Sequence, residues 1–312
     1  MMKLFDLHGD TGYAVMKLRA LQKQNIIADY QLGKRKQGGF QWLCAASYFE
    51  GHETWDDMKA MITALHEEIA LCEDVSLITH KQQLKEGNTL NMILSIEGMC
   101  GIREDVEEKI DWLYAHDIKV ASLAWNDENA LATGVRGNPK RGLSVLGKRV
   151  IERMGAHGMV LDVSHANEKT FWDIMDCAKS PVIATHSNAW ALCDHPRNLY
   201  DEQLLAIAEN GGLVGVVCAG AFVHRDRKLQ SISQLVGHIK YLEQLIGMEH
   251  IALGCDFMDD YDNAQDTMLI DLNSPKDAQK IIDELRSQGF QEAEIRMLAY
   301  ENAHRFFMQH LK

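Results

Sequence analysis

The sequence predicts an α/β fold, a TIM-like (β/α)8 barrel, from three observations. Short β-rich runs recur along the 312 residues, helix-length segments with a 3.6-residue apolar period lie between them, and several runs are apolar without alternation. Strands that alternate with helices pair in parallel through right-handed crossovers. Parallel strands covered on both faces lose the alternation of polar and apolar residues. A doubly wound open sheet is the alternative architecture.

Eight runs, most of them bounded by Gly, Asp, Asn or Ser, are the predicted strands. They are Leu4 to Leu7, Trp42 to Phe49, Leu90 to Ile96, Ile118 to Leu123, Met159 to Val163, Pro181 to Ala184, Gly212 to Val217 and His250 to Leu253. Eight such units in a chain of this length are typical of a (β/α)8 barrel.

Helical periodicity is clearest in two of the connecting segments and in the tail. Thr54 to Cys72 and Asp105 to Ala115 each place their large apolar residues on or near one face. Residues Gln291 to Leu311 have the pattern of an amphipathic helix that closes the barrel. Composition does not break anywhere along the chain, so we expect residues 1–312 to form a single domain.

Composition and charge exclude several classes of partner. The chain has 32 Lys and Arg against 45 Asp and Glu, and a net charge of -13 repels nucleic acid and anionic membranes. It has no run of 18 apolar residues, and the N-terminus lacks the apolar core of a signal peptide. The 7 cysteines are scattered and form no C-x-x-C pair, as in reduced proteins. We therefore expect a cytoplasmic protein that binds neither nucleic acid nor membrane.

Acidic and imidazole side chains follow five of the eight predicted strands. They are His8 and Asp10 after the first strand, Glu97 after the third, His165 after the fifth, His186 after the sixth and Asp256 after the eighth. A lone His at such a place is usually a hydrogen-bonded structural residue, and a lone carboxylate is usually a helix cap. Function in a barrel lies where the strands end, so the coincidence of five strand ends favours a metal site.

The types and spacing of these residues suit a divalent cation. In an extended chain His8 and Asp10 point to the same face. Three imidazoles with two carboxylates suit zinc or a similar ion. One bridging carboxylate would allow two ions that share a water with a pKa lowered toward ~7. His195 and His224 also lie near predicted strand ends, after the sixth and seventh strands.

Several longer motifs in the chain resemble those of a known protein family. They are His8-Gly9-Asp10, Ser95-Ile96-Glu97-Gly98, Leu161-Asp162-Val163-Ser164-His165, Pro181-Val182-Ile183-Ala184-Thr185-His186-Ser187-Asn188-Ala189, Arg197-Asn198-Leu199 and Leu253-Gly254-Cys255-Asp256-Phe257. In these motifs, which keep their order, the chain resembles the membrane (renal) dipeptidase family of zinc metallopeptidases. The similarity extends from residue 4 to the Glu301-Asn302 segment.

The resemblance implies a barrel of the metal-dependent hydrolase type with two zinc ions, which hydrolyses dipeptides through a metal-bridging hydroxide. On this model His8 and Asp10 hold one ion, and His165 and His186 hold the other. Glu97 bridges the two ions. Asp256 steers the hydroxide and passes a proton to the leaving amine. Arg197 clamps the substrate carboxylate, for which a planar guanidinium is suited. The resemblance also suggests a homodimer.

One position departs from the family pattern. After the fourth strand better-known members carry a His that contacts the scissile carbonyl oxygen, whereas this chain reads Trp125-Asn126. Trp125 offers a single N–H donor, and Asn126 would replace the missing donor if its loop turned it inward. Loss of such a donor typically costs about 10² to 10³ in rate. Three alternatives therefore stay open: a metallohydrolase for another small amide, lactam or ester, a barrel that binds metal and a small ligand without turnover, and a metal-free barrel.

Overall fold

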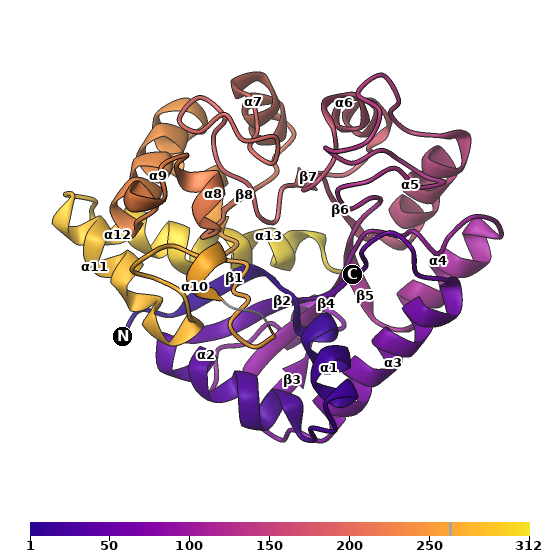
Figure 1. Ribbon diagram of the computed structural model, residues 1–312, viewed down its shortest axis with the longest axis horizontal. Coiled ribbons are helices and arrows are strands. Elements are labelled where there is room, and N and C mark those ends of the chain that lie inside the picture. The colour runs from indigo at the N-terminus through magenta and orange to yellow at the C-terminus, as the bar shows by residue number, and fades with distance from the viewer. Residues whose placement is uncertain (262–263) are drawn as a thin grey trace.

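Eight parallel strands close into a barrel that is surrounded by helices (Figure 1). The computed structural model describes residues 1–261 and 264–312. The strands follow the order β7-β6-β5-β4-β2-β1-β9-β8. A parallel bridge between Ala184 and Val214 then joins the two ends of this sheet, and the N–H of Ala184 donates to the carbonyl of Leu213 at 2.9 Å. The predicted TIM-like barrel is confirmed.

Each of the eight predicted strands is present, with its ends displaced by at most two residues. The strands are β1 (Leu4–Gly9), β2 (Phe40–Tyr48), β4 (Leu90–Glu97), β5 (Ile118–Ser122), β6 (Val160–Asp162), β7 (Val182–Ile183), β8 (Val214–Val216) and β9 (Ile251–Leu253). A ninth strand, β3 (Val75–Leu77), was not predicted. It pairs only with the start of β4 and lies outside the barrel order.

Helices connect the strands and form the outer layer. They are α1 (Thr11–Ala20), α2 (Gly33–Gly38), α3 (Trp55–Ala70), α4 (Val106–Ala115), α5 (Val145–His157), α6 (Glu168–Cys177), α7 (Asp201–Glu209), α8 (Gly220–Val223), α9 (Ile232–Ile246), α10 (Ala264–Thr267), α11 (Gln279–Ser287), α12 (Glu292–Arg296) and α13 (Asn302–His310). Side-chain caps start several of them: Thr54 forms a capping box with Asp57 at α3, and Ser144 accepts from the N–H of Gly147 at α5. None of the described helices has both the length and the apolar character needed to cross a bilayer.

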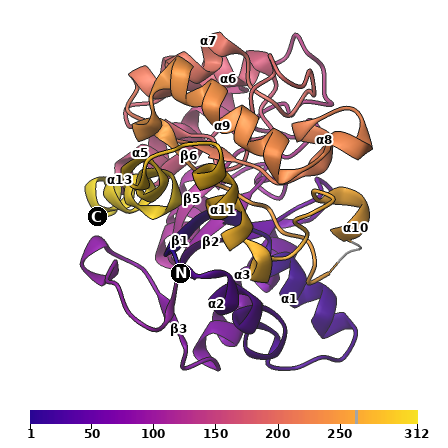
Figure 2. The same ribbon diagram turned by 90° about the vertical axis from the view of Figure 1, so that its left-hand side faces the viewer.

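The C-terminal helix closes one end of the barrel, as its sequence pattern predicted. Phe307 of α13 is fully buried, and its ring stacks on that of Phe5 of β1 at 5.4 Å. Phe5 also stacks on Trp42 of β2, so an aromatic layer fills the floor of the barrel. In Figure 2, α13 lies on one side of the strands, and α8 and α10, which follow strand C-terminal ends, lie on the other. This aromatic layer closes the end of the barrel where the strands begin.

Candidate metal centre

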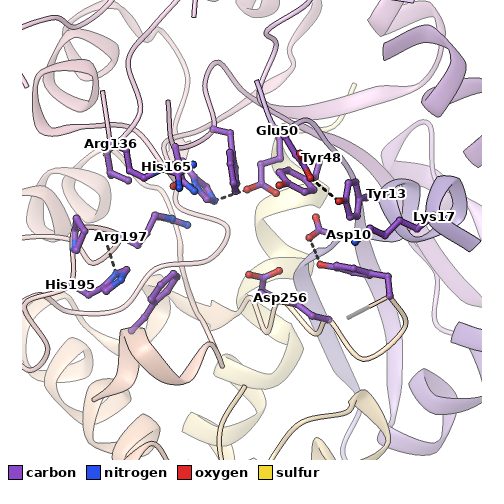
Figure 3. Close-up of a pocket in the computed structure, with 18 residues that line it drawn as sticks. Asp10, Tyr13, Lys17, Tyr48, Glu50, Arg136, His165, His195, Arg197 and Asp256 are labelled. Atoms are coloured by element: carbon purple, nitrogen blue, oxygen red, sulfur yellow. Dashed lines mark hydrogen bonds and ion pairs between the residues drawn. The ribbon is translucent and has the colours of Figure 1, made fainter. Parts of the chain in front are cut away.

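A cavity of about 540 Å³ opens at the rim where the strands end (Figure 3). Its lining draws on the segments after all eight barrel strands, from Asp10 after β1 to Asp256 after β9. Arg136, Arg197 and His195 lie on one side of it, and Glu50 lies with Tyr13 and Lys17 on the other.

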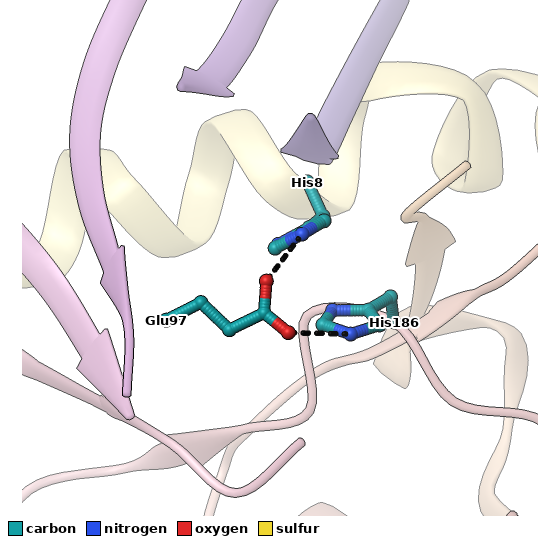
Figure 4. Close-up of side chains that lie close together, drawn as sticks. All are labelled: His8, Glu97 and His186. Atoms are coloured by element: carbon teal, nitrogen blue, oxygen red, sulfur yellow. Dashed lines mark ion pairs between the residues drawn. The ribbon is translucent and has the colours of Figure 1, made fainter. Parts of the chain in front are cut away.

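All the residues predicted as metal ligands are buried and converge at the floor of this cavity. Glu97, the last residue of β4, is central because its two oxygens face different imidazoles (Figure 4). Its Oε2 lies 3.1 Å from Nε2 of His8, and its Oε1 lies 2.5 Å from Nε2 of His165. The same Oε1 is 3.8 Å from Nε2 of His186. One carboxylate thus stands between two groups of donor atoms.

A second group of acids surrounds His8. Its Nε2 lies 3.3 Å from Oδ1 of Asp10 and 3.7 Å from Oδ1 of Asp256. Together with Glu97, three buried carboxylates lie around one imidazole. The spacing of His8 and Asp10 by two residues does bring both side chains to the same side, although β1 ends at Gly9 between them. A cation bound here would offset this concentration of negative charge away from water.

The backbone at two of these residues is strained. His165 has φ of +70° and Asp256 has φ of +57°, which is the left-handed region that side chains other than Gly rarely enter. Each residue follows the end of a barrel strand, β6 and β9 respectively. Strain of this kind collects at functional sites, where the surrounding structure holds it in place.

Burial and neighbouring charge set the ionisation of the cluster. Burial lowers the pKa of His165 to about 4 with help from Arg197, and it lowers the pKa of His186 well below its ordinary value. Neutral imidazoles are the form that binds metals. Burial would also lower the pKa of His8, but Glu97 and Asp10 outweigh it and raise that pKa. Burial raises the pKa of Asp256 to about 7, and the Asp10 and Glu97 carboxylates add to this rise.

The donor atoms fit metal ions. Oδ1 of Asn126 lies 2.9 Å from Nδ1 of His165 and can only accept a hydrogen bond. The imidazole proton of His165 is therefore on Nδ1, and Nε2 keeps its lone pair. Nε2 of His8 and Oδ1 of Asp10 are buried and 3.3 Å apart, and among the described residues neither makes a hydrogen bond of good geometry. Imidazole nitrogen and carboxylate oxygen, with no thiolate among them, are the ligands of zinc and similar divalent ions.

Arg197 is placed to receive an anion. Its side chain is buried, and one Nη2–H donates to the carbonyl of His186 at 3.1 Å. Nε has no hydrogen-bond partner in the described part of the chain. Burial lowers the pKa of Arg197 to about 10, so the group keeps its charge at neutral pH. A buried guanidinium with a free donor at the edge of a cavity is suited to bind a carboxylate.

Trp125 and Asn126 both line the cavity but are already engaged. The ring of Trp125 packs at 5.0 Å from the ring of Tyr48. The guanidinium of Arg136 lies over the Trp125 ring, 4.9 Å from its centre, in a cation–π contact. The side-chain oxygen of Asn126 is occupied by His165. Their predicted contact with substrate stays a prediction, and the structure adds a second task for Asn126, the orientation of a metal-ligand candidate.

Several residues of the cavity were not predicted. Glu50 lies just beyond β2, and its Oε1 accepts from the hydroxyl of Tyr13 at 2.8 Å. The hydroxyl of Tyr261 donates to Oδ2 of Asp10 at 2.7 Å. The position of Glu50 after a predicted strand was a usable signal, whereas nothing near Tyr261 in the sequence marks it. Of the two histidines noted near strand ends, His195 lines the cavity and His224 is not among its lining residues.

Comparison with known families agrees with this geometry. A family model described as membrane dipeptidase (peptidase family M19) matches residues 1–311. The chain belongs to this family. The family membership that the motifs predicted is confirmed. As a member of the membrane dipeptidase family, the chain is a peptide-bond hydrolase. Use of a metal follows from the same membership and from the buried donor groups around His8 and Glu97.

The chain has moderate sequence identity to individual relatives. It is 36% identical over 230 residues to an uncharacterized protein in the pqqA 5' region of Klebsiella pneumoniae, which covers 71% of this chain and 82% of that protein. It is 30% identical over 171 residues to dipeptidase aclJ of Aspergillus oryzae, covering 54% of this chain and 40% of that protein. The match thus spans most of the first relative and under half of the second.

Solved structures show the same fold. A metallo peptidase from Rhodobacter sphaeroides, liganded with a phosphinate mimic of the dipeptide L-Ala-D-Ala, superposes with a TM-score of 0.87 at 22% identity and covers 100% of both chains. Dipeptidase AC of family M19 gives a TM-score of 0.87 at 23% identity and 99% coverage of both. At these identities the likeness supports the barrel fold of the membrane dipeptidase family.

Proposed function

We propose that this dipeptidase-family protein uses two zinc ions per chain and a metal-bridging hydroxide to hydrolyse the amide bond of dipeptides. The observation that carries the proposal is the orientation of Glu97. Its Oε2 faces His8 and its Oε1 faces His165 and His186, so a single buried carboxylate separates two sets of donors. His8 and Asp10 would hold one ion, His165 and His186 the other, and Glu97 both.

The chain's own residues supply positioning and proton transfer. When bound, a pair of divalent ions supplies Lewis acidity and makes hydroxide accessible near neutral pH. Asp256 is a buried carboxyl group whose Oδ1 lies 3.7 Å from Nε2 of His8. From this place beside the donor atoms it would take a proton from the nucleophile and give it to the leaving amine.

Charged groups on both sides of the cavity support a dipeptide as substrate. A dipeptide is a zwitterion with a carboxylate at one end and an ammonium group at the other. Arg197 would bind the carboxylate with its free Nε–H. On the opposite side Glu50, held by Tyr13, would receive the ammonium group. Pairing at both ends would leave no room for a longer peptide and would restrict the substrate to dipeptides.

Trp125 supports a second candidate within the same enzyme class. The ring fills part of the cavity wall between Tyr48 and Arg136, at the position where family members carry the carbonyl-contacting His. A reshaped wall favours another small amide, a lactam or an ester as substrate. The homodimer and the cytoplasmic location implied by sequence stay predictions.

Zinc content and hydrolysis of a dipeptide panel test the proposal together. Protein purified without chelators and supplied with zinc should hold two ions per chain and cleave dipeptides faster than N-acetylated dipeptides, lactones or lactams. Glu97→Gln keeps the side-chain shape but removes the bridging charge, so zinc content should fall and hydrolysis should be lost. Glu67→Gln changes an exposed carboxylate that pairs with Arg19 and serves as the control. Full activity in Glu97→Gln would contradict the bridging role.

A further inference from the structure

Asp162 is a buried carboxylate that lies outside the cavity and outside the group of metal-ligand candidates. It is the last residue of β6. Its Oδ1 accepts from the backbone N–H of Ser164 at 2.9 Å and from that of Thr185 at 3.0 Å. Its Oδ2 accepts from the hydroxyl of Thr185 at 2.7 Å. One aspartate thus joins the ends of β6 and β7 at the residues directly before His165 and His186.

The direction of these hydrogen bonds fixes where the protons lie. An ionised carboxylate only accepts, so the hydroxyl proton of Thr185 must point to Asp162. The hydroxyl oxygen is then left as an acceptor for Nδ1 of His186, which lies 2.8 Å away. Nδ1 of His186 therefore carries the imidazole proton. Its Nε2 keeps a lone pair that is directed toward Glu97 and His165.

We propose that Asp162 and Thr185 are positioning residues that hold His186 in the tautomer whose Nε2 is free to bind a metal ion. This proposal rests on the metal site proposed above. The other tautomer would place a proton on Nε2 and remove the lone pair. Outer partners that fix the tautomer of a ligating histidine typically change metal affinity by about 10 to 100-fold.

A second aspartate in the barrel supports this assignment because it is used in the same way. Oδ1 of Asp6, in β1, accepts from the N–H of His8 at 3.3 Å and from that of Cys255 at 2.8 Å. Cys255 directly precedes Asp256, as Ser164 directly precedes His165, and both of the following residues have left-handed backbone. Each aspartate therefore ties two strand ends together beside a strained residue of the metal centre.

Thr185→Val and Thr185→Ser form a matched pair for the test. Valine keeps the shape and removes the hydroxyl, and serine restores it. Nitrogen-15 NMR of the metal-free protein measures the histidine tautomer directly, and competition with a chelator measures the affinity for zinc. We expect His186 to carry its proton on Nδ1 in the wild type and in Thr185→Ser, and to lose this preference in Thr185→Val with zinc affinity about 10 to 100-fold weaker. A native tautomer and native affinity in Thr185→Val would overturn the proposal.

Asp162→Asn gives a sharper outcome. Two backbone N–H groups hold the side-chain oxygen in place, so the new amide N–H₂ must face Thr185 and donate to its hydroxyl. Oγ of Ser164, 3.2 Å from this hydroxyl, could also accept its proton, so the variant is combined with Ser164→Ala. The hydroxyl would then donate to His186, and the imidazole proton should move to Nε2. An unchanged tautomer in this variant would also overturn the proposal.

A control separates positioning from general stability. Thr170 is equally buried, and its hydroxyl donates to the carbonyl of Thr133 at 2.8 Å, a contact that involves neither Asp162 nor His186. Thr170→Val should lower stability without a change in the tautomer of His186 or in zinc affinity. If wild-type protein bound no zinc, the proposed function would fail while the NMR measurement still decided the tautomer.

Discussion

The Nε2 atoms of His165 and His186 face each other at 2.9 Å. Asn126 and Thr185 place the protons of both rings on Nδ1, so neither Nε2 has a hydrogen to share. Two lone pairs at this distance repel each other, and Oε1 of Glu97 adds a third acceptor. The arrangement stores electrostatic strain that a cation between these atoms would relieve.

Removal of metal should therefore lower the stability of the fold. A ligand present at 100 times its dissociation constant stabilises the native state by about 2.7 kcal/mol. Thermal unfolding should begin at lower temperature after treatment with a chelator and recover when zinc is returned. The same treatment of Glu97→Gln should have a smaller effect. Equal melting curves with and without metal in the wild type would argue against a bound ion.

Arg197→Lys should weaken substrate binding more than catalysis. Lysine keeps the charge but loses the planar donor pair. A hydrogen bond to a charged group contributes about 1.5–3 kcal/mol, so KM for a dipeptide should rise by about 10 to 100-fold with kcat little changed. A dipeptide amide, which has no carboxylate, should show a much smaller change. Arg153→Lys alters an exposed pair with Asp111 and is the control; an unchanged KM in Arg197→Lys would rule out the clamp.

Trp125→Phe should distinguish a wall residue from a hydrogen-bond donor. Phenylalanine preserves the packing against Tyr48 and the contact with Arg136 but has no N–H. We expect kcat for dipeptides to stay within a few-fold of the wild type. A fall of about 10² to 10³ would instead show that the indole N–H stabilises the transition state.

Phe307→Ala should destabilise the protein without affecting the active site. The ring is fully buried against Phe5 in the floor of the barrel, at the end opposite the cavity. Truncation of a buried Phe typically costs about 3–5 kcal/mol. Denaturant unfolding should show this loss, and kcat at a temperature where the variant is folded should be retained. Met308→Ala removes a neighbouring exposed side chain and should change little.

His238 should make stability depend on pH. It is buried in α9, its Nδ1 accepts from the N–H of Ala189 at 3.3 Å, and its Nε2–H donates to the carbonyl of Val223 at 3.0 Å. Burial lowers the pKa of His238 below 6.5, so the unfolded chain binds its proton more readily. This contribution to stability is present above pH 6.5 and is lost as pH falls toward the folded pKa, at up to about 1.4 kcal/mol per unit.

The matching variant for that prediction is His238→Gln, which does not titrate. Its unfolding free energy should fall less steeply than that of the wild type between pH 7 and pH 5. Parallel slopes for the two proteins would show that other groups control the dependence.

Periodicity predicted the barrel, and the barrel explains why the site could be predicted. Parallel strands end at one rim, so His8, Glu97 and His186 had to meet once their strands were recognised. The short strand β3 was missed because three residues carry too little pattern. Glu50 was missed although it directly follows a predicted strand, and Tyr261 was missed because loop conformation brings it into the cavity. The tautomer of His165 depends on Asn126, 39 residues away in sequence, and that of His186 depends on Thr185, whose proton is directed by Asp162, 23 residues away. No local sequence pattern reports the contacts of Asn126 and Asp162.

The position of β1 in the barrel, between β2 and β9, affects how the chain folds during synthesis. A nascent chain that has emerged as far as β7 can form six adjoining strands, but β1 and β7 are then unpaired borders that await β8 and β9. Exposed strand borders invite association between chains. Ribosome-bound intermediates of this length are therefore the stage at which we expect molecular chaperones to matter most.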